Sequence, residues 1–426
     1  MVQDSFTVDT VPFGLARFGF IERDDGTFLA LVNGWLLSVS NDRGRSWSEP
    51  QPLLTKGGTP LTADGKGNAS IIRLASGKIG VAYKRPDVRR RKPGNITLQE
   101  YALFFTTSED EGRTWSEPHR INFPGAWIGL LHDPMMQTRS GRLILPVVTN
   151  HFGRRSEHDA GEAKGQVNGH IVGVEAHGHY PELDIAFVYY SDDEGQTWDR
   201  SDNDIIGWPD DGRHGIYPTE EPTVAETKDG RLLMFSRSTL GRVLESWSDD
   251  DGLSWTRGLP IELCNSLSPV RLRTIATTGD LHCVWNQVTH EEIHLGMRRS
   301  RLTSAISKDS GKTWTHFTTL DCADSLDKSP YQKPDPTIEF VVSRQDCGEL
   351  PANWCIYRYA NVWYAGDMAY IAYDRESFKY PGSPRRQHVL RAIPIDWLYD
   401  DARSDLSLPN DIPEEAAAAE GESIED

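Results

Sequence analysis

The chain has 426 residues, a formal net charge of -18 and 10% aromatic residues, among them 13 tryptophans. Such an acidic protein is a poor partner for nucleic acid or for an anionic membrane surface, and we expect neither. The N-terminus has no basic segment followed by an apolar one, and no apolar run reaches transmembrane length. We therefore expect a cytoplasmic protein, unless a secretory leader was removed.

The cysteines give no sign of a metal site. Their number is odd and their spacing fits no metal pattern: Cys264, Cys283, Cys322, Cys347 and Cys355. We expect free thiols, and disulfides late in the chain remain open. A Gly-rich phosphate loop and a compact metal cluster are also missing from the sequence, so no cofactor is expected.

Pairs of short apolar runs, each joined by a turn, follow one another along the chain. Such runs separated by Gly-containing turns predict β-hairpins. The first five pairs cover residues 17–21 with 28–32, 67–74 with 79–83, 130–136 with 143–148, 217–226 with 231–237, and 265–272 with 281–285. A last set of three runs covers residues 358–364, 368–373 and 389–393.

Two longer segments interrupt this pattern. Residues 84–92 are rich in Lys and Arg, which predicts a solvated basic loop. The insertion at 150–180 contains five histidines whose spacing matches no tight zinc pattern, so we expect a polar loop over one face of the protein.

An eight-residue motif, Ser-x-Asp-x-Gly-x-Ser/Thr-Trp, occurs five times. The copies lie at residues 40–47, 108–115, 191–198, 248–255 and 307–314. The Asp and hydroxyl groups can bond to the local backbone, the Gly allows a positive φ, and the Trp can pack inward. Repetition of one small sheet at such intervals predicts a β-propeller. We expect one chain end to complete the blade of the other, because an open sheet edge is a liability.

The motif resembles the Asp box of the sialidase (neuraminidase) superfamily, also described as the BNR repeat. This resemblance implies an all-β, six-bladed propeller of four-stranded antiparallel sheets. It places each box at the turn between the third and fourth strands, away from the active site, so the boxes are expected to be structural. The whole propeller would span residues 1–409 as one domain, and residues 410–426 read as an acidic disordered tail.

In a propeller the inner strand of every blade starts near the central axis, so one polar residue per blade can converge on a shared pocket. The residues in these places are Arg17, Asn68, His132 with Asp133, Glu220 or Glu221, Asn265 or Ser268, and Tyr359.

The resemblance assigns roles to several of them. It implies that Tyr359 is a nucleophile activated by Glu221, and that Arg17, Arg237 and Arg299 bind a substrate carboxylate, with Asn68 and Glu220 as further binding residues. Guanidinium groups suit a carboxylate because they bind it with two hydrogen bonds. The family's acid/base Asp lies in a loop of the first blade, and this chain has no room for that loop. His132 or Asp133, or a residue of the insertion, could supply the proton instead.

Three functions fit these residues. The first is a sialidase-like glycoside hydrolase that acts on an acidic carbohydrate such as sialic acid, with sialidases the Tyr-nucleophile exception among glycosidases. The second is a propeller polysaccharide lyase on uronic-acid glycans, in which Tyr359 and His132 would move protons. The third is a propeller that binds a glycan or a protein without chemistry. The sugar, its linkage, hydrolysis versus elimination, and the oligomeric state remain open.

Overall fold

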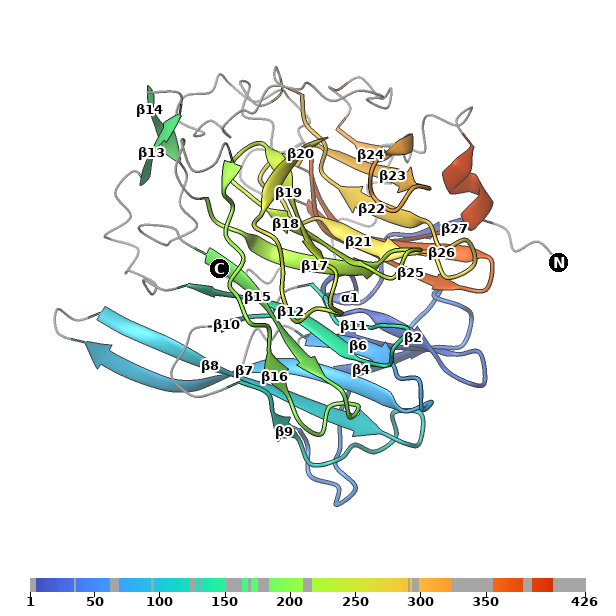
Figure 1. The fold of residues 1–426 in the computed structure, drawn as a ribbon. Coiled ribbons are helices and arrows are strands. Elements are labelled where there is room, and N and C mark those ends of the chain that lie inside the picture. The colour runs from blue at the N-terminus through green and yellow to red at the C-terminus, as the bar shows by residue number, and fades with distance from the viewer. Residues whose placement is uncertain are drawn as a thin grey trace.

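The computed structural model describes residues 5–400 except 34–35, 62–68, 93–95, 123–127, 131, 151–162, 168–169, 175–183, 210–216, 290–291, 293–298, 324–325, 327–354 and 378–384. The fold is a six-bladed β-propeller, as predicted, and Figure 1 shows its sheets arranged around a common centre. Helix is confined in the described residues to short pieces such as α1, Leu15–Phe18, and the 3-10 helix η4, Ile395–Tyr399.

The first three blades follow the chain in order. Their strands are β2 (Phe20–Glu22), β3 (Phe28–Val32), β4 (Leu36–Ser40) and β5 (Gln51–Pro52); β6 (Ala69–Arg73), β7 (Ile79–Lys92), β8 (Ile96–Ser108) and β9 (His119–Arg120); and β10 (Ile128–Gly129), β11 (Met136–Gln137), β12 (Leu143–Asn150), β15 (Asp184–Ser191) and β16 (Asp199–Arg200). A separate hairpin of β13 (Ala163–Val167) and β14 (His170–Val174) lies in the insertion.

The last three blades repeat the same antiparallel order. Their strands are β17 (Glu220–Glu226), β18 (Leu232–Arg237), β19 (Arg242–Ser248) and β20 (Leu259–Cys264); β21 (Arg271–Thr274), β22 (Leu281–Trp285), β23 (Arg301–Ser307) and β24 (Thr315–Cys322); and β25 (Cys355–Ala365), β26 (Met368–Ser377), β27 (Arg385–Pro394) and β1 (Phe6–Val8). The N-terminal strand β1 pairs with β27, so one chain end completes the other's blade as expected.

All five predicted boxes form the same hydrogen-bonded turn between the third and fourth strands of a blade. In the third box, Ser191 Oγ donates to Asp193 Oδ1 at 2.8 Å, and the Thr197 backbone N–H donates to the same oxygen at 2.8 Å. The Thr197 hydroxyl donates to Asp193 Oδ2 at 2.6 Å. These bonds hold the turn closed, which is the structural role expected of the boxes.

Each box glycine also touches the preceding blade. A Cβ on Gly195 would lie 2.1 Å from Phe105 Cε1, and one on Gly112 would lie 2.4 Å from Leu29. Gly44, Gly252 and Gly311 face Leu390, Ile144 and Leu233 in the same way. The boxes therefore bring neighbouring sheets together at a point where only glycine fits.

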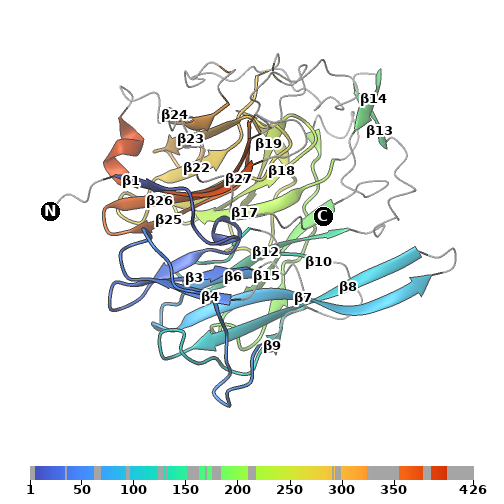
Figure 2. The same ribbon diagram turned by 180° about the vertical axis from the view of Figure 1, so that it is seen from behind.

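Three sequence predictions about local structure were wrong. Arg17 lies in helix α1 and not at the start of a strand, because the chain turns at Gly14 and Gly19 before β2 begins. The basic segment 84–92 is strand and not loop, since β7 pairs with β8 as far as Lys92. Both views show this hairpin extending beyond the other blades (Figure 1, Figure 2). The inner strand predicted over 130–136 is not continuous, since β10 ends at Gly129 and β11 begins only at Met136.

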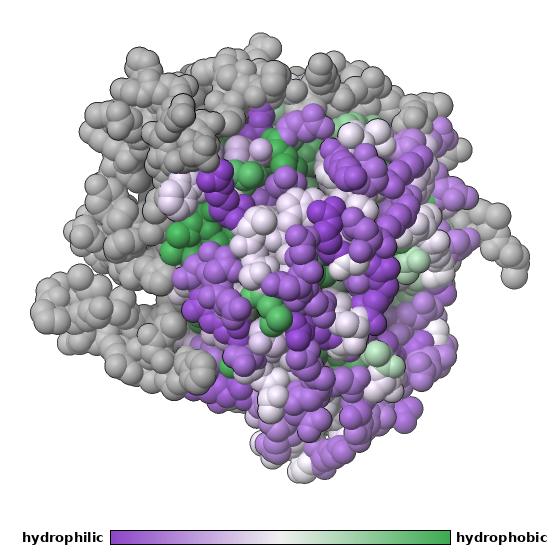
Figure 3. Space-filling view, in the orientation of Figure 1, coloured by the Kyte–Doolittle hydropathy of each residue, from purple (hydrophilic) through white to green (hydrophobic). Residues whose placement is uncertain are grey.

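The surface is polar on the face that Figure 3 shows, with small separate hydrophobic spots among the coloured residues. Among the described residues, the large hydrophobic side chains classed as exposed are Phe13, Trp208 and Leu259. Among the described residues, Cys264, Cys283, Cys322 and Cys355 are buried and form no disulfide, and Cys347 lies outside the described residues. No described helix has the length and hydropathy that crossing a bilayer would require.

Candidate functional site

The predicted residues of the third to sixth blades meet near the axis on an unusual backbone. Five of them have a positive φ: His132 at 60°, Asp133 at 53°, Glu221 at 47°, Arg299 at 56° and Tyr359 at 54°. This region of φ is uncommon for residues other than Gly and costs about 1–2 kcal/mol for each residue. Such strain persists where the surrounding structure enforces it, and it is concentrated at functional sites.

Irregularities within two strands accompany two of these conformations. The pairing of β17 with β18 shifts register between Glu220 and Thr223, and that of β25 with β26 shifts between Arg358 and Asn361. A bulge of this kind redirects a side chain, so Glu221 and Tyr359 depart from the regular alternation of their strands.

Glu221 is bound on both of its carboxylate oxygens. Its Oε1 lies 3.0 Å from His132 Nε2, and its Oε2 accepts a hydrogen bond of 3.1 Å from Arg237 Nη1. Arg237 Nε lies 3.3 Å from Glu220 Oε2, and all four side chains are buried. Burial raises the pKa of Glu221, but the charges of Arg237 and Arg299 and the hydrogen bond with His132 outweigh it and hold the pKa well below its usual range. Glu221 is therefore an anion at neutral pH.

Tyr359 lies against two of the other predicted residues. Its ring is stacked on the His132 imidazole, with centroids 4.5 Å apart and an interplanar angle of 25°. The guanidinium carbon of Arg17 is 4.2 Å from the centroid of the Tyr359 ring, and that of Arg299 is 5.7 Å away. A phenol next to two cations and an imidazole is a group that can take part in proton transfer or nucleophilic attack.

Besides these ring contacts, the Arg17 and Arg299 guanidinium groups each have a polar contact with the protein. Arg17 Nη2 lies 3.6 Å from Asp374 Oδ2, while Arg299 Nη2 donates to the Leu267 carbonyl at 3.2 Å. Both residues are partly exposed. Burial lowers the pKa of Arg299. Asp374 was not predicted as a site residue, although it directly follows the apolar run that ends at Tyr373, and that position is its only signal in the sequence.

Asp133 lies at the centre of a buried network. Its Oδ1 accepts hydrogen bonds from Ser70 Oγ at 2.6 Å and from the Ile71 backbone N–H at 3.0 Å. Its Oδ2 accepts from Arg273 at 2.7 Å and from Trp363 Nε1 at 3.1 Å. The side chain is fully buried and links the third blade to the second, fifth and sixth. These contacts favour a structural role over the catalytic one predicted for Asp133.

Two further predicted positions do not add to the cluster. Asn68 lies outside the described residues. Asn265 forms a local turn, in which its Oδ1 accepts from the Ser268 backbone N–H at 2.8 Å and its Nδ2 donates to the Ser268 carbonyl at 3.0 Å. No group of three or more His, Cys, Asp or Glu side chains among the described residues could hold a metal ion.

A family model for the BNR repeat-like domain matches residues 34–388, which is most of the chain. The chain belongs to the BNR repeat-like domain family. This match, with the six-bladed fold, confirms the resemblance that the five boxes indicated.

Solved structures show the same propeller fold at low identity to this BNR repeat-like protein. A protein of unknown function from Dyadobacter fermentans DSM 18053 has a TM-score of 0.53 at 14% identity, and the match covers 91% of this chain and 96% of that one. NanB sialidase from Streptococcus pneumoniae gives 0.51 at 13%, covering 92% and 70%. The intramolecular trans-sialidase from Ruminococcus gnavus, complexed with oseltamivir carboxylate, gives 0.50 at 13%, covering 90% and 94%.

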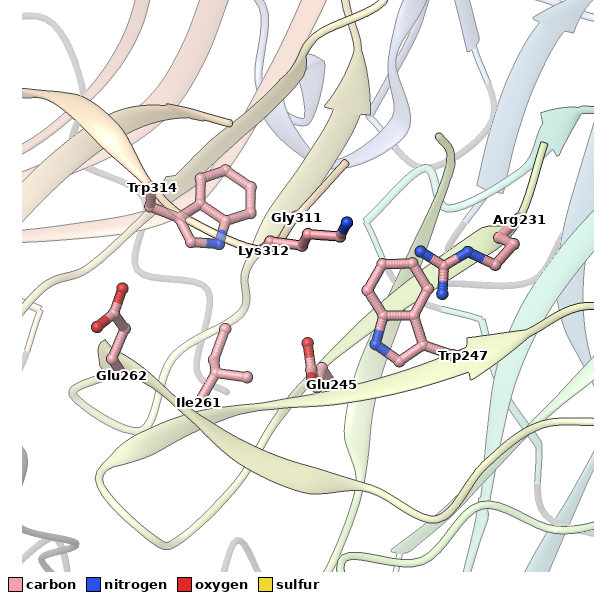
Figure 4. Close-up of a pocket in the computed structure, with 8 residues that line it drawn as sticks. All are labelled: Arg231, Glu245, Trp247, Ile261, Glu262, Gly311, Lys312 and Trp314. Carbon is pink, nitrogen blue, oxygen red and sulfur yellow. The ribbon is translucent and has the colours of Figure 1, made fainter. Parts of the chain in front are cut away.

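A hollow of about 480 Å³ in this BNR repeat-like protein lies between the fourth and fifth blades (Figure 4). It is lined by residues of β19, β20 and the fifth box, and none of the predicted site residues reaches it. In this view the Lys312 side chain extends between Trp314 and Trp247. The Arg231 guanidinium carbon lies 4.4 Å from the Trp247 ring centroid. We therefore place the candidate site at the axis.

Proposed function

We propose that this protein cleaves glycosidic bonds beside a carboxylate-bearing sugar, as a sialidase-like glycoside hydrolase acting on sialic acid or a related acidic glycan. The observation that carries the proposal is the group formed by Tyr359, Glu221 and His132 with three arginines at the axis. Membership of the BNR repeat-like domain family and the sialidase fold support it.

The three arginines have different partners and therefore different roles in the site. Arg237 is engaged by two carboxylates, Glu220 and Glu221, so its main effect is to keep Glu221 ionised. Arg17 and Arg299 flank the Tyr359 ring and are partly exposed. These two guanidinium groups are therefore the ones that would bind the substrate carboxylate, and the bound sugar would lie beside the Tyr359 ring.

Hydrolysis would proceed through Tyr359. Its phenol oxygen would attack the anomeric carbon as the bond to the glycosidic oxygen breaks, and the leaving oxygen would gain a proton. Water would then cleave the bond between the sugar and Tyr359. A phenol titrates near pH 10, so the attack at neutral pH depends on a nearby proton acceptor. His132 stacks on the Tyr359 ring and is bonded to Glu221, so this pair of residues would supply the acceptor.

Elimination is the second candidate, and the stacking of His132 on Tyr359 favours it. In this reaction a base removes the proton from the carbon next to the carboxylate, a C=C bond forms, and the C–O bond breaks as the leaving oxygen gains a proton. Tyr359 and His132, the two proton-transfer groups that a lyase needs, are both present. The connection between β3, which ends at Val32, and β4, which begins at Leu36, leaves no space for an acid-bearing loop.

Mass spectrometry of products separates the candidates. The protein would be incubated with a panel of sialylated and uronic-acid glycans, and we expect a released acidic sugar that has gained one water. An unsaturated product without added water would identify the lyase. Binding of a glycan without turnover of any panel member would overturn the proposal and identify a binding propeller.

A further inference from the structure

Glu221 is a poor proton acceptor, because its charge is already neutralised. Both of its oxygens are bound, one by His132 and the other by Arg237, and neighbouring cations hold its pKa well below the usual range. An ionised carboxylate can only accept hydrogen bonds. In the contact with His132, the imidazole must therefore be the donor, and the donated proton lies on Nε2.

The contact between His132 Nε2 and Glu221 determines whether the other ring nitrogen, Nδ1, is protonated. Burial lowers the pKa of His132, which outweighs the opposing effect of Glu221, so the ring is neutral at pH 7. A neutral imidazole has one proton, and that proton lies on Nε2. Nδ1 then has a free lone pair, and this atom is buried without a hydrogen-bond partner. An unsatisfied buried acceptor costs about 1–3 kcal/mol, so it calls for an explanation.

We infer that His132 accepts the proton of the reaction through Nδ1, and that Glu221 is the positioning residue which fixes its tautomer. The inference rests on the proposed function, and it changes the role that the sialidase resemblance gave to Glu221. The proton would come from the Tyr359 hydroxyl in hydrolysis, or from the substrate carbon in elimination. The Tyr359 and His132 rings lie against each other with centroids 4.5 Å apart, and the imidazolium formed would be stabilised by Glu221, whose Oε1 lies 3.0 Å from Nε2.

Most of the charged groups around the His132 ring are cations, which disfavour its protonation. The charged and titratable groups placed around it are Glu221 of β17, Arg237 of β18, Arg17 of α1, Arg271 of β21, Arg299 before β23 and Tyr359 of β25. Glu221 is the anion that contacts the ring directly. Its replacement by Gln would remove that stabilisation and lower the pKa of His132 further.

The first test needs no substrate. In the full-length protein labelled with ¹⁵N-histidine, NMR should show His132 protonated on Nε2 and unprotonated on Nδ1 at neutral pH. His282 is an internal control, because both of its nitrogens have partners, Tyr364 and Ser304. A proton on Nδ1, or a charged ring at neutral pH, would overturn the inference whether or not a substrate is known.

The second test compares two variants with the substrate found by the product screen. H132Q should lower kcat by about 10²-fold or more, the usual contribution of a general base. E221Q should lower kcat by less than H132Q does. It should also move the acid limb of the pH profile to lower pH, a shift that is not expected if Glu221 has a purely structural role. An unshifted profile with a loss as large as that of H132Q would show that Glu221 is itself the base. Near-UV circular dichroism would verify that both variants fold.

Discussion

At the scale of residues, the candidate site depends on side chains aimed by backbone that most residues avoid. His132, Glu221, Arg299 and Tyr359 all have a positive φ; Glu221 and Tyr359 lie at bulges of their strands, and His132 lies between β10 and β11. Their packing is specific as well, since the Tyr359 ring contacts both His132 and Arg17. Side-chain identity and backbone strain together therefore produce the cluster.

Tyr359→Phe removes the hydroxyl and leaves the ring in place between its neighbours. We expect kcat to fall by at least about 10²-fold with little change in KM, because both candidate reactions use the hydroxyl only in the chemical step. Steady-state kinetics on the identified glycan would measure this. Tyr190→Phe, on an outer strand of the third blade, is the control and should retain activity. Unchanged turnover in Tyr359→Phe would exclude Tyr359 from the chemistry.

His282 makes stability depend on pH in a defined window. Burial lowers its pKa from 6.5 to about 3, so below pH 6.5 the unfolded chain binds a proton that the folded protein does not. Folding stability should therefore fall with decreasing pH, by about 1.4 kcal/mol per unit for this residue. His132 adds to the slope in the same direction.

Urea unfolding at pH 7, 6 and 5 would measure this dependence. His282→Gln should show a shallower loss of stability with falling pH than the parent protein, although it is less stable at pH 7 for want of two hydrogen bonds. Identical slopes in parent and variant would show that His282 does not titrate as its burial requires.

At the scale of elements, the boxes join the blades as well as closing their own turns. Each box glycine has a positive φ and lies against an apolar side chain of the preceding blade. The sequence could predict the turns, because Ser, Asp and Gly recur at fixed offsets. It could not predict the contact between blades, because the partner of Gly195 is Phe105, far away along the chain.

Gly195→Ala should destabilise the protein much more than Gly26→Ala. Both glycines have a positive φ, which costs about 1 kcal/mol for Ala, but only Gly195 has a neighbour in the way. Overpacking against Phe105 should add about 1–3 kcal/mol. Urea unfolding of the two variants gives the comparison directly. Equal losses would mean that the box glycine does not set the blade spacing.

The predictions that failed were also local. Hydropathy patterns can identify apolar runs, but they do not reveal that a basic stretch continues a strand, as 84–92 does in β7. The helix at Arg17 is only four residues long, too short for any periodicity to show. The break in the inner strand of the third blade places His132 and Asp133 in left-handed conformations that ordinary residues rarely adopt.

At the scale of the whole molecule, the ring is closed by non-covalent pairing. Phe6, Thr7 and Val8 pair with Ala392, Arg391 and Leu390, and the Phe6 ring packs on Tyr370 with centroids 6.5 Å apart. The N-terminal strand therefore completes the last blade, and the core shared by the first and last blades adds to this closure. This closure was predictable, because an open edge is avoided in stable sheets.

Removal of residues 1–9 should open the ring. We expect a loss of about 2–4 kcal/mol from the apolar contacts of the half-buried Phe6 and Val8, together with self-association through the exposed edge of β27. Unfolding curves and size-exclusion chromatography would report both effects. Removal of residues 1–4 alone leaves β1 intact and serves as the control. A shortened protein as stable as its control would contradict closure through β1.

The grouping of the site residues near the axis was predictable from topology, but the role of each residue was harder to predict. Residues at blade starts must approach the axis, which is why Tyr359, Glu221 and His132 could be grouped from sequence alone. The bond between His132 and Glu221 and the network around Asp133 depend on side-chain packing across blades, which no spacing in the sequence encodes.

Recognition of a sugar carboxylate is the central claim, and paired substrates test it most directly. Turnover of an acidic glycan would be compared with that of the same glycan after reduction of its carboxylate to an alcohol. We predict turnover of the acid, little or none of the alcohol, and a smaller difference in Arg299→Met, which lacks one guanidinium group. Equal turnover of both substrates by the parent protein would contradict the account.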